Sequence, residues 1–529
     1  MTEPFNAAAY LSDRRVDAGD GARPAFHHPR GTTTYGELAQ EVRRVAAGLV
    51  ALGVRPEERV LLAMADDLEL AVGILATMYV GAVAVPSSTM LTGPELRKLV
   101  VDSRARALLG SAEFAGSVTV AAAGAPDLRH LVLTGDVAPD VPGVACATWD
   151  VLRTEPPLRA PYATWDESPA LWLYTSGTTG TPKGAMHRHA DIRSVCETYA
   201  RHVLRIGPDD VCLSAAKLFF AYGIGNSLFF PLSVGASAVL EPARPNPVRF
   251  GELTRTHGVT LFFGGPSFWG PLMAADLGRE TFATVRNGIS AGEALPARML
   301  HGVRERYGVE ILDGIGSTEA LHIFISNEAG RVVPGSSGFP VPGYAVELRR
   351  ADGSVIEGPD EPGMLHVSGD SLCTGYWCRT AVNRTVFQGE WMRTGDTYVR
   401  GADGSWTCLG RADDVLKVGG IWVSPTEVET RLLEHPAVAE AVVVGVPDTD
   451  GLDKPVAYVV PRPGRHVDPD DLIGFCKQEL ASFKRPRRVV EVAELPKTAT
   501  GKIQRYRLRA MAAEAPVPTT AADVADAQA

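Results

Sequence analysis

The chain has 529 residues, too many for one compact core, so at least two domains are expected. Hydrophobic residues make up 45% and charged residues 22%, as in an ordinary soluble globular protein, and the formal net charge of −10 argues against general nucleic-acid binding. The most apolar stretch, residues 71–86, is too short to span a bilayer and contains glycines, which excludes a membrane-spanning helix there.

The cysteines and the N-terminus indicate the compartment. Seven cysteines form no CxxC pair and no zinc spacing, which is typical of reduced thiols. The N-terminal segment has no basic stretch leading into an apolar core, so we expect no signal peptide. The sequence therefore predicts a cytoplasmic protein with no membrane partner and no nucleic-acid partner.

The first half of the chain alternates between helical and strand-like hydrophobic spacing. The expected segments are a helix at 36–54, a strand at 59–64, a helix at 68–79 and a strand at 82–85, and the same rhythm recurs at 211–240 and 250–267. Such alternation predicts parallel sheets covered by helices.

A loop rich in glycine and hydroxyl residues, Tyr174–Gly184, follows the apolar run 170–174. Its glycines allow close backbone approach, and its hydroxyls, amide groups and Lys183 can all face phosphate oxygens. The loop does not fit the phosphate loop of kinases and ATPases, because Pro182 stands at the second glycine position and Gly184 follows the lysine. The alternative is an ordinary surface turn with a chance lysine.

A second motif, Gly314–Glu319, follows the strand-like run 309–312. By itself a Gly-Ser-Thr-Glu turn is more often a helix cap than a magnesium site.

After about Arg331 the pattern changes to short strand-like runs and turns, which predicts a smaller β subdomain. The expected strands are 345–349, 363–367 and 406–409, followed by a helix at 425–434, a strand at 439–444 and a helix at 470–480. Residues 514–529 have no periodicity, and we expect them to be disordered.

Three short motifs in this half contain charged residues that can face a ligand. Thr394-Gly-Asp396 is followed by Gly410-Arg-Ala-Asp-Asp414, and Leu495-Pro-Lys-Thr-Ala-Thr-Gly-Lys502 comes near the end of the chain. The basic run Lys484–Arg488 is about equally well explained as a solvated turn and as a phosphate-binding segment.

Together these motifs resemble the adenylate-forming superfamily of acyl- and aryl-CoA ligases, luciferase and peptide-synthetase adenylation domains. The segments Phe219–Gly225 and Ser317–Phe324 are most similar to those of benzoate-CoA ligases. The resemblance covers roughly residues 5 to 510. It implies an AMP-forming reaction of benzoate, ATP and CoA through benzoyl-adenylate, with Mg²⁺ as cofactor and a monomeric or homodimeric enzyme.

The resemblance also implies an α/β fold. Residues 1–412 would form a large domain of two parallel-type sheets covered by helices, with a small β-barrel-like subdomain from about 331. Residues 413–512 would form a small mobile α+β domain that turns about a hinge at Asp413, and 513–529 a tail.

The resemblance further implies roles for residues that contact the nucleotide. Thr318 contacts the α-phosphate, Glu319 holds Mg²⁺, and Lys502 bridges the attacking carboxylate and the α-phosphate. Asp396 accepts the ribose hydroxyls, and Arg411 contacts ribose and phosphate. The remaining ATP-binding set is Thr175, Ser176, Gly177, Thr178, Thr179, Lys183, Ser290, Gly292, Glu293, Asp313, Gly314, Ile315 and Ser317. Within it, Ser176, Thr178, Thr179 and Lys183 hold the departing phosphates.

The commoner form of the second motif has a Tyr three residues before its Ser or Thr, where it stacks on adenine. Here Gly314 occupies that place. We therefore expect the stacking surface to come from Ile315 or from the segment 290–293.

For the acid, the resemblance implies a small flat pocket lined by Ala221, Tyr222, Gly316, His322 and Ile323. His322 would orient the carboxylate through its N–H, and Tyr222 would pack against the ring, although both also suit an ordinary core. For CoA, the resemblance and the basic run indicate Lys417, Gly419, Gly420, Trp422, Lys484 and Arg485.

Three other functions stay open at this point. The acid can be a hydroxy- or aminobenzoate, since small pocket changes discriminate by only about 1–3 kcal/mol. The acceptor can be a carrier protein rather than free CoA. A nucleotide-binding regulator without catalysis is disfavoured by the intact Thr318, Glu319, Asp396, Arg411 and Lys502.

Overall fold

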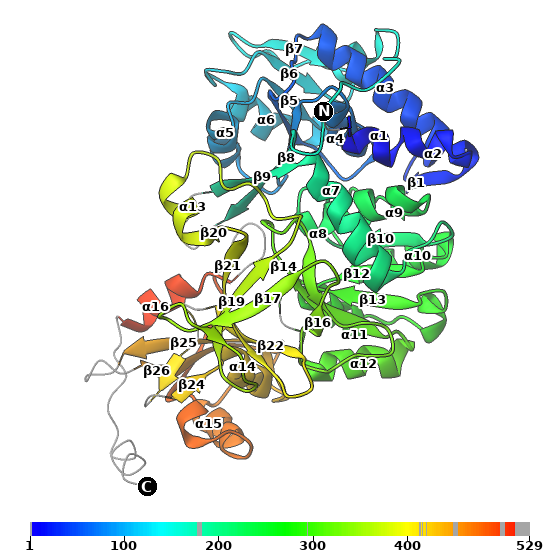
Figure 1. The fold of residues 1–529 in the computed structure, drawn as a ribbon. Coiled ribbons are helices and arrows are strands. Elements are labelled where there is room, and N and C mark those ends of the chain that lie inside the picture. Colours follow the sequence, from blue (N-terminus) through cyan, green and yellow to red (C-terminus); the bar gives the residue numbers. More distant parts are fainter. Residues whose placement is uncertain are drawn as a thin grey trace. The chain divides into compact units, whose positions relative to one another are not determined.

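The structure is a computed structural model and describes residues 3–176, 182–293, 295–411, 414, 416–418, 421–447, 453–497 and 503–513. The chain divides into two compact units, each described separately below. The first contains Met1–Val346 and Val367–Met392, and the second contains Glu347–His366 and Arg393–Ala529. Figure 1 traces the chain through its helices and strands.

The first unit contains a seven-stranded sheet that is parallel except at one edge. Its strands, in spatial order, are β7 (Ala145–Thr148), β6 (His130–Leu133), β5 (Ala107–Gly110), β3 (Arg59–Ala63), β4 (Val83–Pro86), β8 (Pro169–Ser176) and β9 (Pro182–Arg188). Only β9 runs antiparallel, because a short loop joins it directly to β8.

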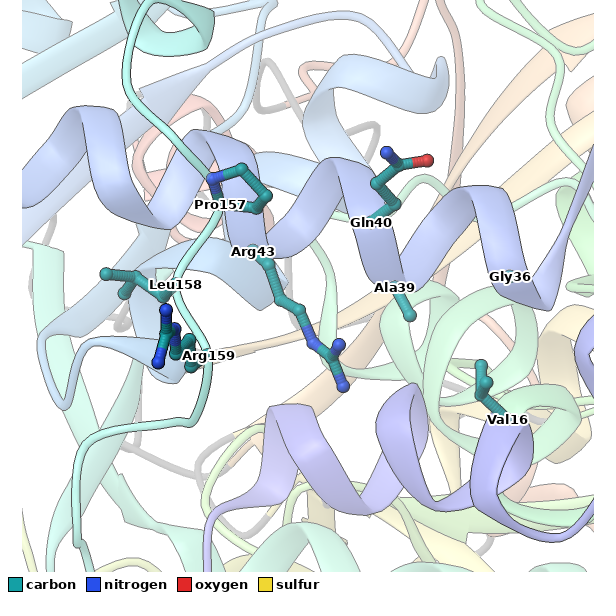
Figure 2. Close-up of a pocket in the computed structure, with 8 residues that line it drawn as sticks. All are labelled: Val16, Gly36, Ala39, Gln40, Arg43, Pro157, Leu158 and Arg159. Atoms are coloured by element: carbon teal, nitrogen blue, oxygen red, sulfur yellow. The ribbon is translucent and has the colours of Figure 1, made fainter.

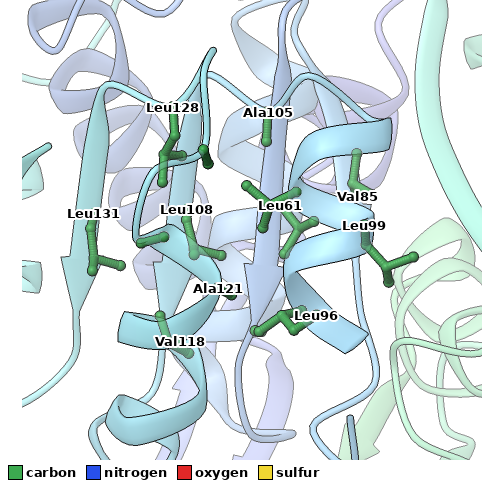
Figure 3. Packing of buried hydrophobic residues seen from close by; sticks show 14 of the residues in the cluster. Leu61, Val85, Leu96, Leu99, Ala105, Leu108, Val118, Ala121, Leu128 and Leu131 are labelled. Carbon is green, nitrogen blue, oxygen red and sulfur yellow. The ribbon is translucent and has the colours of Figure 1, made fainter. Parts of the chain in front are cut away.

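Helices cover both faces of this sheet. They are α3 (Tyr35–Ala51), α4 (Leu68–Tyr79), α5 (Gly93–Asp102) and α6 (Ala115–Ala122). Side chains alternate along β3, so Leu61 packs with α5 and α6 in the cluster of Figure 3, whereas Leu62 lies next to Gly73 of α4. Burial on both faces explains the nearly continuous apolar sequence of β3, β4 and β5.

The first unit also contains a nine-stranded sheet. Its spatial order is β16 (Phe339–Pro340), β15 (Ile323–Ser326), β14 (Ile311–Gly316), β13 (Asn287–Ser290), β12 (Leu261–Gly264), β10 (Val211–Ser214), β11 (Ser237–Val239), β1 (Pro24–His28) and β2 (Gly31–Thr34). The strands from β14 to β1 are parallel, and the outer pairs at both edges are antiparallel. The carboxyl ends of β12, β13 and β14 are therefore neighbours.

Three of the remaining helices of this unit pack on the second sheet. An aromatic-rich core packs α10 (Pro247–His257), α11 (Pro266–Ala274) and α12 (Ala297–Tyr307) against the sheet. The other elements are α1 (Ala7–Leu11), α2 (Asp13–Asp17), η1 (Asp20–Ala22), η2 (Ala112–Phe114), η3 (Trp149–Arg153), α7 (His189–Val195), η4 (Cys196–Leu204), α8 (Ala221–Ile224), η5 (Gly225–Phe229), α9 (Phe230–Val234), η6 (Arg279–Phe282), α13 (Thr380–Val386) and β20 (Phe387–Gln388).

The second unit begins with antiparallel strands. These are β17 (Ala345–Arg349), β18 (Val355–Ile356), β19 (Gly363–Ser368), β21 (Trp391–Arg400) and β22 (Trp406–Arg411). A compact α/β segment follows, with β23 (Leu416–Val418), β24 (Ile421–Val423), α14 (Pro425–Leu433), β25 (Val438–Pro447), β26 (Asp453–Pro461), α15 (Pro469–Lys477), η7 (Ser482–Lys484), β27 (Arg488–Glu491) and α16 (Arg505–Ala513). Separate apolar clusters cover the two faces of the β25–β26–β27 sheet.

The predicted fold class is confirmed: two largely parallel sheets form the large unit, and a small α/β segment follows. The helix predicted at 68–79 and the strand predicted at 345–349 have the predicted bounds. β16 pairs with β15 in the large sheet, and the β subdomain expected from about 331 stays a prediction. The domain boundary at 412/413, the mobility of 413–512 and the disorder of 513–529 stay predictions, and residues 412, 413 and 514–529 lie outside the described residues.

Gly48 of α3 lies against η3 and offers a test of this packing. A Cβ at Gly48 would come within 2.4 Å of the backbone of Leu152, so Gly48→Ala should lower the free energy of unfolding by about 1–3 kcal/mol. Gly116→Ala in α6 is the control, since a Cβ there meets nothing within 4 Å. Calorimetry of both variants checks this, and equal stability of the two would contradict the tight packing.

Candidate active site

The loop predicted to hold phosphates is the turn of a β-hairpin. Thr175 of β8 pairs with Lys183 of β9, so both flank the loop tip. Residues 177–181 and the side chain of Ser176 lie outside the described residues, and the roles given to Gly177, Thr178, Thr179 and Ser176 stay predictions. The Lys183 Nζ lies 5.2 Å from the centre of the Tyr376 ring.

The Thr318–Glu319 turn connects β14 to the antiparallel β15 and is held at three successive carbonyls. His187 Nε2 lies 2.8 Å from the Thr318 oxygen, the Cys373 amide donates to the Glu319 oxygen at 2.8 Å, and the Ser371 hydroxyl donates to the Ala320 oxygen at 2.7 Å. These bonds hold the backbone of the turn in place.

His187 is placed by a carboxylate on its other side. Its Nδ1 lies 3.1 Å from Asp191 Oδ2, and both side chains are fully buried. The arrangement links β9 to the Thr318–Glu319 turn. His187 was not predicted from the sequence, because a lone histidine after a strand carries no signal of its distant partner.

Glu319 is suited to hold a magnesium ion. The Tyr376 hydroxyl donates to its Oε1 at 2.6 Å, and the second carboxylate oxygen has no hydrogen-bond partner among the described residues. Within those residues no three His, Cys, Asp or Glu side chains gather as a metal cluster. Mg²⁺ typically takes one or two carboxylates and completes its shell with water and phosphate oxygens, so one free carboxylate oxygen fits this ion.

Ser290, the last residue of β13, pairs with Asp313 in the middle of β14. Burial raises the pKa of Asp313 to about 8, although the Ser290 hydroxyl and the amides of Leu295 and Gly314 oppose part of the rise. The raised pKa favours the neutral form of the Asp313 carboxyl. Its Oδ1 has no hydrogen-bond partner within the described part of the chain, which suits contact with a polar purine edge.

The surface for adenine stacking stays a prediction, and the structure limits where it can lie. A Cβ at Gly314 would come 2.7 Å from the Ile325 oxygen, so there is no room for a side chain at this position. Ile315, the next residue, is half-buried. In the segment 290–293, Gly292 has a positive φ of 94° and Ala294 beyond it lies outside the described residues.

Tyr222 and His322, both predicted to line the acid pocket, lie together in an aromatic cluster. Their ring centres are 5.5 Å apart, and the rings of Tyr199 and Phe230 lie 5.2 and 4.5 Å from that of His322. The Tyr222 hydroxyl donates to the Ile289 oxygen at 3.1 Å. Tyr199, in η4, was missed because nothing in its local sequence links it to this cluster.

The hydrogen bonds of His322 differ from the predicted donation to a carboxylate. Burial lowers its pKa to about 3, so the ring is neutral and carries one N–H. Nε2 lies 3.1 Å from Asn226 Oδ1 and 3.3 Å from the Tyr222 oxygen, and both are acceptors. The N–H therefore points at these groups, and Nδ1 is a buried acceptor without a partner among the described residues. Donation to the acid would require the other tautomer.

Small residues make room for His322. A Cβ at Gly316 would come 2.4 Å from the His322 oxygen, and one at Gly225 would come 2.4 Å from its Cδ2. Ala221 is the first residue of α8 and Ile323 the first residue of β15, and both side chains are buried. Lining of the pocket by Ala221, Gly316 and Ile323 stays a prediction.

In the second unit, Asp396 and Arg411 are opposite each other on β21 and β22. Arg411 Nε lies 3.3 Å from Asp396 Oδ1, and Arg411 Nη1 donates to the Thr394 oxygen at 2.9 Å. The structure thus brings together the two residues predicted to bind ribose. The Arg411 side chain is 53% exposed, so this pair contributes little to stability and can exchange partners.

The predicted CoA residues are only partly described. Gly419, Gly420, Asp413 and Lys502 lie outside the described residues, as do the side chains of Lys417 and Trp422. Lys484 Nζ lies 2.7 Å from Glu427 Oε1, and Arg485 Nε donates to the Leu480 oxygen at 2.8 Å. Both cations therefore have protein partners, and their role toward CoA stays a prediction.

A separate surface cavity of about 450 Å³ lies by α2 and α3 (Figure 2). Its lining is Val16, Gly36, Ala39, Gln40, Arg43, Pro157, Leu158 and Arg159. Arg43 already pairs with Asp13 at 3.1 Å. The cavity shares no residue with the predicted site. Among the described residues, none of the helices is both long and apolar enough to cross a membrane.

Comparison with known proteins gives consistent matches. Residues 13–377 match the family of AMP-binding enzymes, and residues 427–502 match the AMP-binding enzyme C-terminal domain. The chain is 42% identical to a benzoate–CoA ligase of Thauera aromatica over 96% of both chains. It is also 42% identical to a 4-hydroxybenzoate–CoA/benzoate–CoA ligase of Rhodopseudomonas palustris, over 96% of this chain and 94% of the other. The crystal structure of a benzoate CoA ligase from Burkholderia xenovorans LB400 superimposes with a TM-score of 0.86 at 41% identity, covering 96% of this chain and 100% of that one.

Proposed function

This chain belongs to the AMP-binding enzyme family, and from that membership we propose that it is an ATP-dependent benzoate-CoA ligase. The observation that carries the proposal is its 42% identity to benzoate-CoA ligases over nearly the whole chain. The described geometry supports it, because Asp313 lies in β14 and the segment between β14 and β15 carries both the Thr318–Glu319 turn and His322, whose ring lies 5.5 Å from that of Tyr222.

The reaction has two steps. A benzoate oxygen attacks the α-phosphorus of ATP, and pyrophosphate leaves with the electron pair of the broken P–O bond. The CoA sulfur then attacks the carbonyl carbon of benzoyl-adenylate, its proton passes to solvent or a base, and AMP leaves. Splitting the reaction stores the energy of ATP in a mixed anhydride that a thiol can cleave.

The first step brings together negatively charged reactants, and cations must offset their repulsion. Glu319 would hold Mg²⁺, which would supply Lewis-acid stabilisation of phosphate charge. Lys183 supplies a cation at the phosphate hairpin, and Lys502 supplies one at the α-phosphate. Thr318 donates a hydrogen bond to the α-phosphate.

The acid-binding part of the proposal is supported by the aromatic cluster. The rings of Tyr199, Tyr222 and Phe230 lie within 6 Å of the His322 ring, and His322 itself is neutral. An apolar lining with few polar groups suits a flat, unsubstituted ring. We place the enzyme in the cytoplasm, a proposal supported by seven unpaired thiols.

A panel of acids tests the function. We expect benzoate to give benzoyl-CoA, AMP and pyrophosphate with the highest kcat/KM. Hydroxy- and aminobenzoates should be slower by roughly 10–200-fold, the range that one small pocket difference allows. Short aliphatic acids should be poorer still. Thioester formation is measured by chromatography, with free CoA and acyl-carrier proteins compared as acceptors.

Two results would contradict the proposal. A hydroxy- or aminobenzoate with higher kcat/KM than benzoate would move the assignment to that acid. Transfer to a carrier protein without transfer to CoA would make the protein a carrier-loading enzyme.

A further inference from the structure

A segment of residues 371–377, here called the strap, joins the two motifs that the proposed function assigns to ATP. One end of the strap runs antiparallel beside β9, directly after Lys183. The Trp377 amide donates to the Gly184 oxygen at 2.9 Å, and the Met186 amide donates to the Gly375 oxygen at 3.0 Å. The strap is thus attached to the phosphate hairpin by backbone hydrogen bonds.

The other end of the strap holds the Thr318–Glu319 turn. The Ser371 hydroxyl and the Cys373 amide donate to the carbonyls of Ala320 and Glu319. The hairpin and the turn are far apart in sequence, and the strap joins them within the first unit in addition to the His187 contact with Thr318.

Tyr376 lies in the middle of this connection and is 5% exposed. Its hydroxyl donates to Glu319 Oε1 at 2.6 Å, and its ring centre is 5.2 Å from Lys183 Nζ. One side chain therefore contacts both the carboxylate assigned to the metal and the lysine assigned to phosphate.

Hydrogen bonds hold the Tyr376 backbone, and apolar side chains pack around its ring. The Asn383 side chain accepts from the Tyr376 amide at 2.8 Å and donates to its carbonyl at 2.9 Å, as a neighbouring strand would. The ring packs in a small apolar cluster with Ala185 and Cys373. The hydroxyl is consequently held in place before any ligand binds.

We infer that Tyr376 is a positioning residue for the nucleotide and its metal ion. This inference rests on the proposed function, because it takes Glu319 as a metal ligand. The hydroxyl occupies one oxygen of Glu319 and leaves the other for the ion, while the ring face attracts the Lys183 ammonium. Preorganised partners of this kind save the cost of reorienting charged groups at the moment of reaction.

Tyr376→Phe tests the role of the hydroxyl, since it keeps the ring on Lys183 and in the apolar cluster. With Mn²⁺ as the probe and a non-hydrolysable ATP analogue, without acid, we expect the variant to bind Mn²⁺ about 10–100-fold more weakly by electron paramagnetic resonance, as is usual when an outer partner of a metal ligand is lost. Thioester formation from supplied benzoyl-adenylate should be unchanged.

Tyr307→Phe is the matched control. Tyr307 is also buried and donates to a backbone carbonyl, that of Leu272, at 2.8 Å, but it lies in α12 outside the predicted site. It should show normal Mn²⁺ binding. Tyr376→Phe combined with Glu319→Gln should bind Mn²⁺ no more weakly than Glu319→Gln alone, because the hydroxyl acts through that carboxylate.

The outcomes separate this inference from the proposed function. Unchanged Mn²⁺ affinity in Tyr376→Phe would overturn the role of Tyr376. The role would also be overturned if Tyr376→Phe weakened Mn²⁺ binding by the same factor in the wild-type enzyme and in the Glu319→Gln enzyme. Failure of the proposed function would instead appear as a wild-type enzyme that forms no acyl-CoA from any acid in the panel.

Discussion

Replacing Lys502 with alanine should abolish formation of benzoyl-adenylate while sparing the thioester step. The reason is charge: the attacking carboxylate and the α-phosphate repel each other in the first step, whereas the second step begins from an adenylate in which that repulsion has been overcome. Loss of one preorganised donor at a reacting centre typically costs at least about 10²–10³ in kcat. Benzoate-dependent exchange of labelled pyrophosphate into ATP measures the first step, and release of AMP from supplied benzoyl-adenylate and CoA measures the second.

Lys497→Ala is the control for Lys502→Ala, because it removes a lysine from the same motif. Lys497 Nζ pairs with Glu440 Oε2 at 2.6 Å, and both side chains are about 40% exposed, so its loss should leave both steps nearly intact. Equal loss of both half-reactions in Lys502→Ala would remove Lys502 from its proposed role.

Replacing Glu319 with glutamine should lower adenylate formation by about 10²–10³, the range typical for loss of one electrostatic stabiliser of a transition state. The change keeps the shape of the side chain and its acceptor oxygen for Tyr376, but removes the charge that a magnesium ion requires. The loss should be partly recovered at high Mg²⁺ concentration. Pyrophosphate exchange measured over a range of Mg²⁺ concentrations checks this.

Glu328→Gln serves as the control for Glu319→Gln, because Glu328 follows β15 and belongs to a backbone bridge with Arg331. Its exchange rate and Mg²⁺ dependence should match those of the wild type. A Glu319→Gln enzyme with an unchanged Mg²⁺ dependence would show that another group holds the ion.

Much of the fold could be predicted because its signals are local. The spacing of apolar residues in 68–79 predicts a helix, and the observed α4 has the same bounds. Alternation of helices with short apolar strands reports parallel sheets, which both large sheets confirm. The pairing of β16 with β15 could not be predicted, because it depends on a partner strand and the local turn signals after 331 do not contain that partner.

The structure brings together some of the predicted site residues that it describes. Asp396 and Arg411 are cross-strand neighbours, and Tyr222 and His322 share one cluster. The sequence missed His187, Tyr199 and Tyr376. Each of these acts through a partner more than fifty positions away, such as Thr318 for His187 and Glu319 for Tyr376.

The sequence by itself determined the class of chemistry, because motifs such as Tyr174–Gly184 and Gly314–Glu319 carry their reactive groups within a few consecutive residues. Only the tertiary structure decided the chemical state and direction of those groups. Burial keeps His322 neutral, and two acceptors from elsewhere in the chain direct its N–H. The strap likewise fixes Glu319 through Tyr376. Protonation, tautomer and rotamer depend on neighbours brought together by folding, and a linear motif does not contain them.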